Sequence, residues 1–183
     1  MNRWNELLKS LAGRLGIIQD GLRVRGEVTW ELFGPDGQLK RKATTKNLVI
    51  TNGDNYVASR IYSAAALWTY YMKLGESPNV VTKATADAYL AAGDYLTGTA
   101  HAMDATWPKV GASANIAQFV VTWAPTEGTA ADIYRASIVD NAADAAEGDA
   151  THTLATALLP DAPINKGAAD TLVVTWNITF LGA

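Results

Sequence analysis

The sequence predicts a mainly β protein, an antiparallel β-sandwich or jelly-roll with an N-terminal amphipathic helix and one short inserted helix. Three observations lead to this fold class. Apolar and polar residues alternate with a period of two in several separate stretches, as in strands that have one wet face. Gly, Pro, Asn and Asp cluster between these stretches as turn signals. The first part of the chain instead has apolar residues at helical spacing.

The N-terminal segment, residues 3–15, is predicted to form the amphipathic helix. A single apolar stripe runs along it at positions i, i+3, i+4, i+7 and i+11, formed by Trp4, Leu7, Leu8, Leu11 and Leu15. A helix of this length is marginal alone in water, so the stripe needs a surface, either this chain's own sheet, a second subunit or another protein. We therefore predict a helical arm over residues 1–21 and take the five stripe residues as candidate partner-binding residues.

A β-hairpin is expected at the start of the sandwich domain, which is predicted to span residues 22–183. Residues 23–32 alternate between apolar and polar side chains and predict a strand. The tetrapeptide Gly-Pro-Asp-Gly at residues 34–37 is a strong turn signal, because proline presets φ and glycine accepts a positive φ. Residues 38–44 then return as the second strand of the hairpin.

The middle of the chain is predicted to contain the inserted helix and an irregular excursion. A short apolar strand over residues 46–50 leads into turn and N-cap residues, which predict a helix over residues 55–66. Another alternating strand follows over residues 68–74. Residues 75–115 have weak periodicity, with a short helix over residues 85–92, and excursions of this length often carry contacts.

The C-terminal third has the clearest strand pattern. Strands are expected over residues 117–123, 133–139, 152–159 and 171–180, with an acidic loop or hairpin over residues 140–150. The strand over residues 171–180 has the cleanest alternation, so we expect it in the middle of a sheet. The whole pattern predicts about seven or eight strands, which favours a sandwich or a jelly-roll.

The composition excludes much of the usual catalytic chemistry. The chain has no cysteine and only two histidines, and it lacks nucleophile-elbow, zinc-protease, phosphate-loop and dinucleotide-binding motifs. We therefore expect no enzyme activity, no cofactor and no metal site. Asp140, Asp144, Glu147 and Asp149 resemble calcium ligands only in residue type, because they lack the alternate-residue spacing of a calcium loop, and a solvated loop is favoured.

Charge is unevenly distributed along the chain. Residues 1–46 carry nine basic and five acidic residues, a net charge of +4, whereas the remaining 137 residues carry six basic and 13 acidic residues, a net charge of −7. This asymmetry is typical of a basic face that docks on an acidic partner, and equally of a solvated polar face.

Two further features bear on possible ligands. The basic cluster of Lys40, Arg41, Lys42 and Lys46 has no interleaved aromatic residues, so a charge-protected edge strand is favoured over nucleic-acid binding. The tryptophans on the apolar sides of predicted strands are expected in the core rather than on a sugar-binding platform, and they are Trp30, Trp68, Trp123 and Trp176. No long apolar run or signal-peptide pattern is present, so we expect neither a membrane partner nor secretion.

Four stretches together resemble a known group of proteins. They are Gly26-Glu27-Val28 running to Leu32 before a Pro-Asp-Gly turn, Lys-Asn-Leu-Val-Ile-Thr-Asn-Gly at residues 46–53, Met-Lys-Leu-Gly at residues 72–75, and Leu159-Pro160 with Asp-Thr-Leu-Val-Val-Thr-Trp-Asn-Ile-Thr-Phe at residues 170–180. This pattern is similar to that of small structural proteins of tailed bacteriophages, which are head decoration (cement) proteins or tail and fibre components. The sequence departs from the pattern at Arg135 and Ser137, in a strand where relatives often have an acidic residue and Gly-Leu-Phe.

The resemblance spans residues 22–181 and implies a non-enzymatic virion protein, assembled in the host cytoplasm. Its expected partners are copies of itself, as a trimer, and the major capsid protein or other virion proteins. We expect an auxiliary capsid protein that decorates or cements the head. The alternatives are a tail-tip, baseplate or fibre component of the same fold, a carbohydrate-binding or glycan-cleaving module for host recognition, and a cellular β-sandwich adaptor.

Overall fold

A computed structural model describes residues 23–49, 53–54, 70–80, 82, 95–96, 98–139 and 153–181. The predicted helical arm over residues 1–21, the short helix over residues 85–92 and the acidic loop over residues 140–150 lie outside these residues. The inserted helix also lies outside them, except that Gly53 and Asp54, which directly precede it, have helical backbone conformation.

The described strands form two five-stranded sheets and one two-stranded sheet, and every pairing between them is antiparallel. In order across the first sheet, the strands are β2 (Leu39–Lys46), β1 (Arg23–Phe33), β12 (Thr171–Leu181), β7 (Ile116–Trp123) and β6 (Lys109–Val110). Across the second sheet they are β3 (Leu48–Val49), β10 (Thr153–Leu158), β9 (Arg135–Val139), β4 (Tyr71–Gly75) and β5 (His101–Ala102). The small sheet pairs β8 (Ala130–Ile133) with β11 (Ile164–Lys166).

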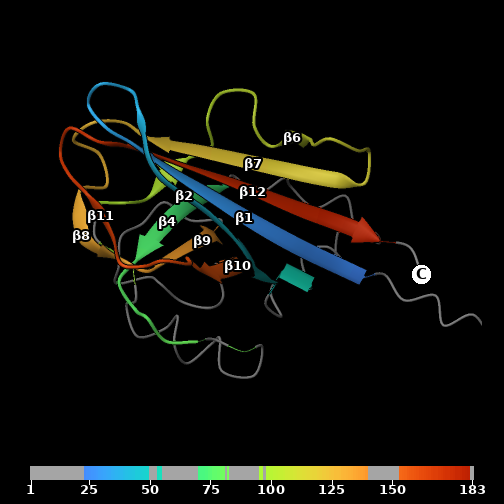
Figure 1. Ribbon diagram of the computed structural model, residues 1–183. Coiled ribbons are helices and arrows are strands. Elements are labelled where there is room, and N and C mark those ends of the chain that lie inside the picture. Colours follow the sequence, from blue (N-terminus) through green and yellow to red (C-terminus); the bar gives the residue numbers. More distant parts are fainter. Residues whose placement is uncertain are drawn as a thin grey trace, which may run out of the picture.

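The two large sheets lie in two layers, with β1, β12 and β7 side by side in one and β4, β9 and β10 in the other (Figure 1). This arrangement confirms the mainly β, antiparallel prediction and is that of a β-sandwich.

The predicted hairpin at the start of the domain is confirmed. Strands β1 and β2 are joined by the turn at residues 34–37, in which the amide of Gly37 donates a hydrogen bond to the carbonyl oxygen of Gly34 at 2.9 Å. Gly37 has a φ of 75°, in the left-handed region where glycine has no steric cost. The turn is closed on its other side by Asp36, whose Oδ1 accepts a hydrogen bond from the amide of Gln38 at 3.0 Å.

The central position predicted for the strand over residues 171–180 is also confirmed. Strand β12 lies between β1 and β7, and its register places Trp176 opposite Val28 on one side and Phe119 on the other. Its alternate side chains therefore point into the core, while the intervening ones lie on the outer face of the sheet.

The strand predicted over residues 133–139 is confirmed from Arg135 to Val139, but its first residue belongs to a different strand. Strand β8 ends at Ile133 and β9 begins at Arg135, and the two belong to different sheets. Tyr134 lies at the break, where its amide donates to the carbonyl oxygen of Gly75 at 2.9 Å and its carbonyl accepts from the amide of Leu159 at 2.8 Å. No glycine or proline marks this change of sheet, so the sequence contains no turn signal for it.

The predicted number of strands is also too low, because the described part of the chain alone contains twelve. Three of the four additional strands, β5, β6 and β11, are two or three residues long, and the fourth is β8, with four residues. Strands of two or three residues cannot show an alternating pattern, which needs four or more residues to be recognised.

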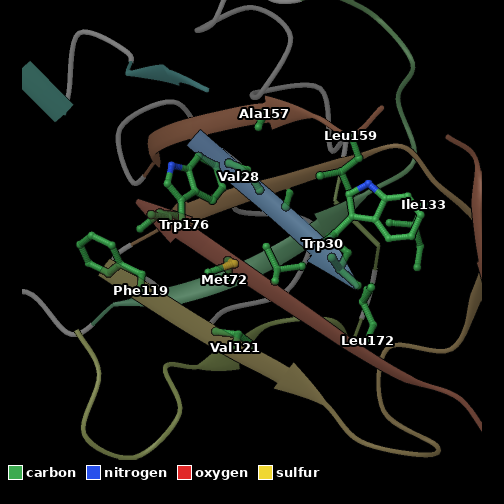
Figure 2. Close-up of a cluster of buried hydrophobic side chains, with 14 of the residues drawn as sticks. Val28, Trp30, Met72, Phe119, Val121, Ile133, Ala157, Leu159, Leu172 and Trp176 are labelled. Atoms are coloured by element: carbon green, nitrogen blue, oxygen red, sulfur yellow. The ribbon is translucent and has the colours of Figure 1, made fainter. Parts of the chain in front are cut away.

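The core between the sheets is built around three tryptophans of the first sheet. Trp30, Trp123 and Trp176 come from β1, β7 and β12 and are fully buried, as predicted. Figure 2 shows Trp30 and Trp176 among the neighbouring core side chains. Each faces an aliphatic or aromatic neighbour along its row of the sheet. The second sheet contributes small residues to the same core, Ala136, Ala155 and Ala157. Met72, Leu74 and Ile138 of the second sheet belong to the same cluster, so large and small side chains together fill the space between the layers.

The chain crosses from the first sheet to the second at Asn47, between β2 and β3. The amide of Asn47 donates to the carbonyl oxygen of Gly26 at 3.1 Å, and the Asn47 side chain lies directly over Gly26. A few residues on, a Cβ at Gly53 would lie 2.4 Å from the carbonyl oxygen of Leu154. Both glycines therefore occupy places where another segment of backbone or side chain comes too close for a larger residue.

Candidate functional site

The five predicted partner-binding residues, Trp4, Leu7, Leu8, Leu11 and Leu15, lie outside the described residues. The structure nevertheless fixes where the N-terminal segment leaves the domain. Arg23 pairs with Leu181 and Val24 pairs with Phe180, at the end of the first sheet where β1 begins and β12 ends. Any surface near this end of the sandwich is therefore within easy reach of the N-terminal segment.

An apolar cavity of about 150 Å³ lies between the two sheets at this end of the sandwich. The first sheet lines it with Val24, Ile178 and Phe180, among others, and the second sheet lines it with side chains such as Ile138 and Leu154. Nearly all of the lining surface is apolar carbon. Val24, Ile178 and Phe180 are only half-buried, so the core is incompletely closed here.

A second, more open hollow of about 450 Å³ continues from this cavity along the hairpin of β6 and β7. The two share Tyr70, Ala117, Phe119 and Phe180 in their linings, and we refer to them together as the apolar cleft. The rings of Tyr70 and Phe119 meet edge to face inside it, with centroids 5.4 Å apart. Val110 lies at its rim and is 64% exposed, so the cleft mouth is apolar as well.

The wall formed by the β6–β7 hairpin is held in place by polar contacts. The amide of Phe180 donates to the carbonyl oxygen of Asn115 at 2.9 Å, and the Asn115 Nδ2 donates back to the carbonyl oxygen of Phe180 at 3.0 Å. Upstream, the carboxylate of Asp104 accepts hydrogen bonds from the amide and the hydroxyl of Thr122 at 2.9 and 2.7 Å. The described part of the predicted excursion is thus anchored to the sheet, and it supplies one side of the cleft.

The opposite end of the first sheet carries a set of charged contacts. The Nζ of Lys40, in β2, lies 2.6 Å from Oδ1 of Asp170, which directly precedes β12. The second oxygen of Asp170 accepts a hydrogen bond from the amide of Gly167 at 3.1 Å. The hydrogen bond from Lys40 is the main reason that the pKa of Asp170 lies below its ordinary value. Asp170 therefore ties the edge strand to the start of the central strand.

Lys166 and Glu127 continue these contacts toward the second sheet. Lys166 is fully buried, its Nζ donates to the carbonyl oxygen of Ala124 at 3.0 Å, and burial lowers its pKa. Glu127 accepts a hydrogen bond from the amide of Ala124 at 2.8 Å, which lowers the pKa of that carboxyl group. Its carboxylate also lies 3.4 Å from Nε2 of His101 in β5. These residues fasten loops of the fold to one another, which is a structural role.

The basic cluster lies on β2, at the edge of the first sheet, as the sequence predicted. Besides the Lys40 contact, Lys42 lies 2.8 Å from Glu31 on the neighbouring strand. The guanidinium of Arg41 lies 5.4 Å from the ring centroid of Trp30 and donates to the carbonyl oxygen of Asp161 at 2.5 Å. These cations contact groups of their own chain, and their position suits an edge strand that resists pairing with other strands.

A row of buried polar residues, which the sequence pattern does not reveal, lies on the outer face of the second sheet. Arg135 and Ser137, where the sequence departs from the phage pattern, are 1% and 0% exposed. Arg135 Nη1 and the Ser137 hydroxyl both donate to the hydroxyl oxygen of Thr156, at 3.1 and 3.0 Å, and Arg135 Nη2 donates to the carbonyl oxygen of Asn79. Lys73, which alternates with the apolar residues of the predicted strand over residues 68–74, is 2% exposed. Alternation along one strand cannot reveal that both faces of a sheet are covered.

Within the described ranges, no group of three or more His, Asp or Glu side chains lies where it could hold a metal ion. The four acidic residues of the loop over residues 140–150, together with Trp68 and His152, fall outside those ranges. None of the helices in the described part is both long enough and apolar enough to cross a bilayer. The chain matches no protein-family model, no curated protein and no solved structure.

Proposed function

We propose that this chain is a non-enzymatic structural protein of a tailed-bacteriophage virion, and specifically an auxiliary capsid protein that decorates or cements the head. It assembles as a trimer and contacts the major capsid protein, with the N-terminal arm as its attachment device. The proposal rests on the resemblance of residues 22–181 to phage structural proteins and on the role that the resembling residues have in the fold.

The residues that carry the resemblance are packing residues. Gly26 and Asn47 belong to two of the four stretches and contact each other where the chain changes sheets. Gly53, which ends the second stretch, makes room for the backbone at Leu154. Trp176 of the last stretch is fully buried in the core. Because the resembling residues serve to pack the fold, they support the proposal that the protein acts as a rigid structural component.

The charged residues of the described part support the same reading. Asp170, Glu127 and Glu31 each contact a basic side chain from another segment of the fold, namely Lys40, His101 and Lys42. On a virion, the protein would adhere through apolar surface that is buried at many copies of one interface. Each Å² of apolar surface buried there contributes about 25 cal/mol of binding free energy. Because the lattice presents many sites at once, a weak single contact suffices for stable attachment.

The test is attachment to the particle that encodes the protein. Full-length protein and a variant lacking residues 1–20 are added to particles from which the protein has been removed, and bound protein is counted by gel densitometry. We expect the truncated protein to fold, as judged by circular dichroism, and to bind at least tenfold less. Equal binding by the two proteins would show that the arm is not the attachment device.

Copy number and location decide between head and tail. Hundreds of copies per particle, with gold label over the head in electron micrographs, are expected for an auxiliary capsid protein. A handful of copies at one end would instead make it a tail-tip, baseplate or fibre component of the same fold. A specific hit on a glycan array would favour the host-recognition module.

A further inference from the structure

We propose that in the free subunit the apolar stripe of the N-terminal arm, Trp4, Leu7, Leu8, Leu11 and Leu15, occupies the apolar cleft of its own chain. This inference deepens the proposed function, because it states where the attachment arm lies before assembly. The position of the arm is tested on the free protein without a virion particle. The result can therefore contradict this inference without contradicting the proposed function, and the reverse also holds.

The cleft lies beside the place where the N-terminal segment joins the domain. Val24 and Phe180 face each other across β1 and β12, and both line the inner cavity. The described chain begins one residue earlier, at Arg23. The N-terminal segment therefore leaves the domain at the cleft itself, and not at the charged opposite end of the sheet.

The connection between arm and domain is short but sufficient. Seven residues, 16–22, separate Leu15 from Arg23, and an extended chain of that length spans about 25 Å. Gly16 and Gly21 lie in this connection and let it turn back on the domain. At this separation the local concentration of the arm at its own cleft is on the order of millimolar, far above that of a second copy in dilute solution.

The chemistry of the cleft matches that of the stripe. The inner cavity, at about 150 Å³, is lined by apolar side chains such as Phe119, Ile178 and Leu154 and has the volume of one large apolar group. The outer hollow, at about 450 Å³, offers room for neighbouring side chains of the stripe beside exposed Val110. A helix as short as the predicted arm is marginal alone in water, and the cleft mouth exposes apolar surface to solvent. Each therefore supplies the apolar cover that the other lacks.

Because the chain has no cysteine, engineered cysteine pairs report this contact cleanly. One cysteine replaces exposed Val110 at the cleft rim, and the second replaces Leu8 or Leu11 on the stripe, or Ser10 on the opposite side of the arm. The matched control moves the first cysteine to Leu39, which is 50% exposed and lies at the far end of the first sheet. A short bis-maleimide reagent is added to the full chain at low micromolar concentration.

We expect Val110→Cys paired with Leu8→Cys or Leu11→Cys to give an internally crosslinked monomer. Its yield should be at least fivefold higher than when either stripe cysteine is paired with Leu39→Cys. It should also be higher than the yield of Val110→Cys paired with Ser10→Cys. Equal yields for the rim and the far-end position would overturn the proposal. Crosslinked dimers in place of crosslinked monomers would also overturn it, by placing the stripe in a second copy.

A second measurement on cysteine-free protein guards against distortion by the crosslinker. In a Leu8→Asp/Leu11→Asp variant the stripe can no longer lie in an apolar cleft, so binding of the apolar dye 1-anilinonaphthalene-8-sulfonate is expected to rise severalfold. The control Ser10→Asp changes the charge of the arm without touching the stripe and leaves dye binding unchanged. Unaltered dye binding in the double variant would show that the stripe does not cover the cleft.

Discussion

The side-chain amide of Asn47 lies where the Cβ of any larger residue at position 26 would have to be, with Oδ1 only 1.4 Å from that place. Gly26 is on β1, and Asn47 is where the chain leaves the first sheet for the second. The absence of a side chain at Gly26 is therefore what allows Asn47 to close this corner of the sandwich.

Gly26→Ala is expected to destabilise the fold by about 1–3 kcal/mol, because the added methyl group must displace the Asn47 side chain. Urea unfolding followed by tryptophan fluorescence measures the loss. In an Asn47→Ala background the same substitution should cost far less, since the obstructing atoms are gone. An equal cost in both backgrounds would mean that contact with Asn47 is not the cause.

Asn47→Leu is expected to stabilise the protein by about 1 kcal/mol. Both Oδ1 and Nδ2 of Asn47 are buried without a hydrogen-bond partner in the part of the chain that the structure describes, and leucine has a similar shape without polar atoms. Thermal and urea unfolding report the change. A clear loss of stability would show that the amide is satisfied in solution.

Two core tryptophans offer a matched comparison. The indole Nε1 of Trp123 donates to the carbonyl oxygen of Thr99 at 2.9 Å, whereas the buried Nε1 of Trp176 has no acceptor among the described residues. Trp123→Phe and Trp176→Phe remove the same atoms, but only the first breaks a hydrogen bond and leaves a buried carbonyl unpaired. We expect Trp123→Phe to cost about 1 kcal/mol more in unfolding free energy.

Stability is expected to depend on pH through Asp170. Because the Asp170 pKa is lower in the folded chain than its ordinary value of 3.8, the ionised carboxylate stabilises the fold above that pH, and this contribution is lost as pH falls through the lowered folded pKa. Asp170→Asn should therefore be less stable than the wild type at neutral pH, with a difference that shrinks in acid.

The measurement is urea unfolding at a series of pH values from neutral to about pH 2. Asp132→Asn, which removes an equally negative but exposed side chain, serves as the control and should follow the wild type. A difference between wild type and Asp170→Asn that stays constant over this range would exclude the salt bridge with Lys40 as its source.

The long strands could be predicted from the sequence because each has one buried and one wet face. Val28, Trp30 and Leu32 on β1 alternate with polar residues, and along much of β7 and β12 buried residues alternate with more exposed ones. The rule fails on the second sheet, where Lys73 and Ser137 are buried on the face opposite the core. It also fails at Tyr134, where the chain changes sheets without a turn residue.

The apolar cleft could not be predicted in the same way. Its lining residues are distant in sequence. Val24, Phe119 and Phe180 meet through the pairing of β1, β12 and β7, and Tyr70 comes from the segment that directly precedes β4 in the second sheet. In its own segment, each of these residues has the sequence pattern of an ordinary core residue. The stripe over residues 3–15, in contrast, is a local pattern, so the sequence indicates that a partner surface is needed without indicating which one.

The central place of β12 has a consequence for how the chain acquires its fold. Strand β1 pairs with β12 along its whole length, and β7 reaches β1 only through β12. During synthesis the β1–β2 hairpin can form early, but the sheet has to wait for residues 171–181 before its two halves join. Until then β1 and β7 each expose an edge of unpaired backbone N–H and C=O groups, so we expect slow folding and a nascent chain that depends on chaperones.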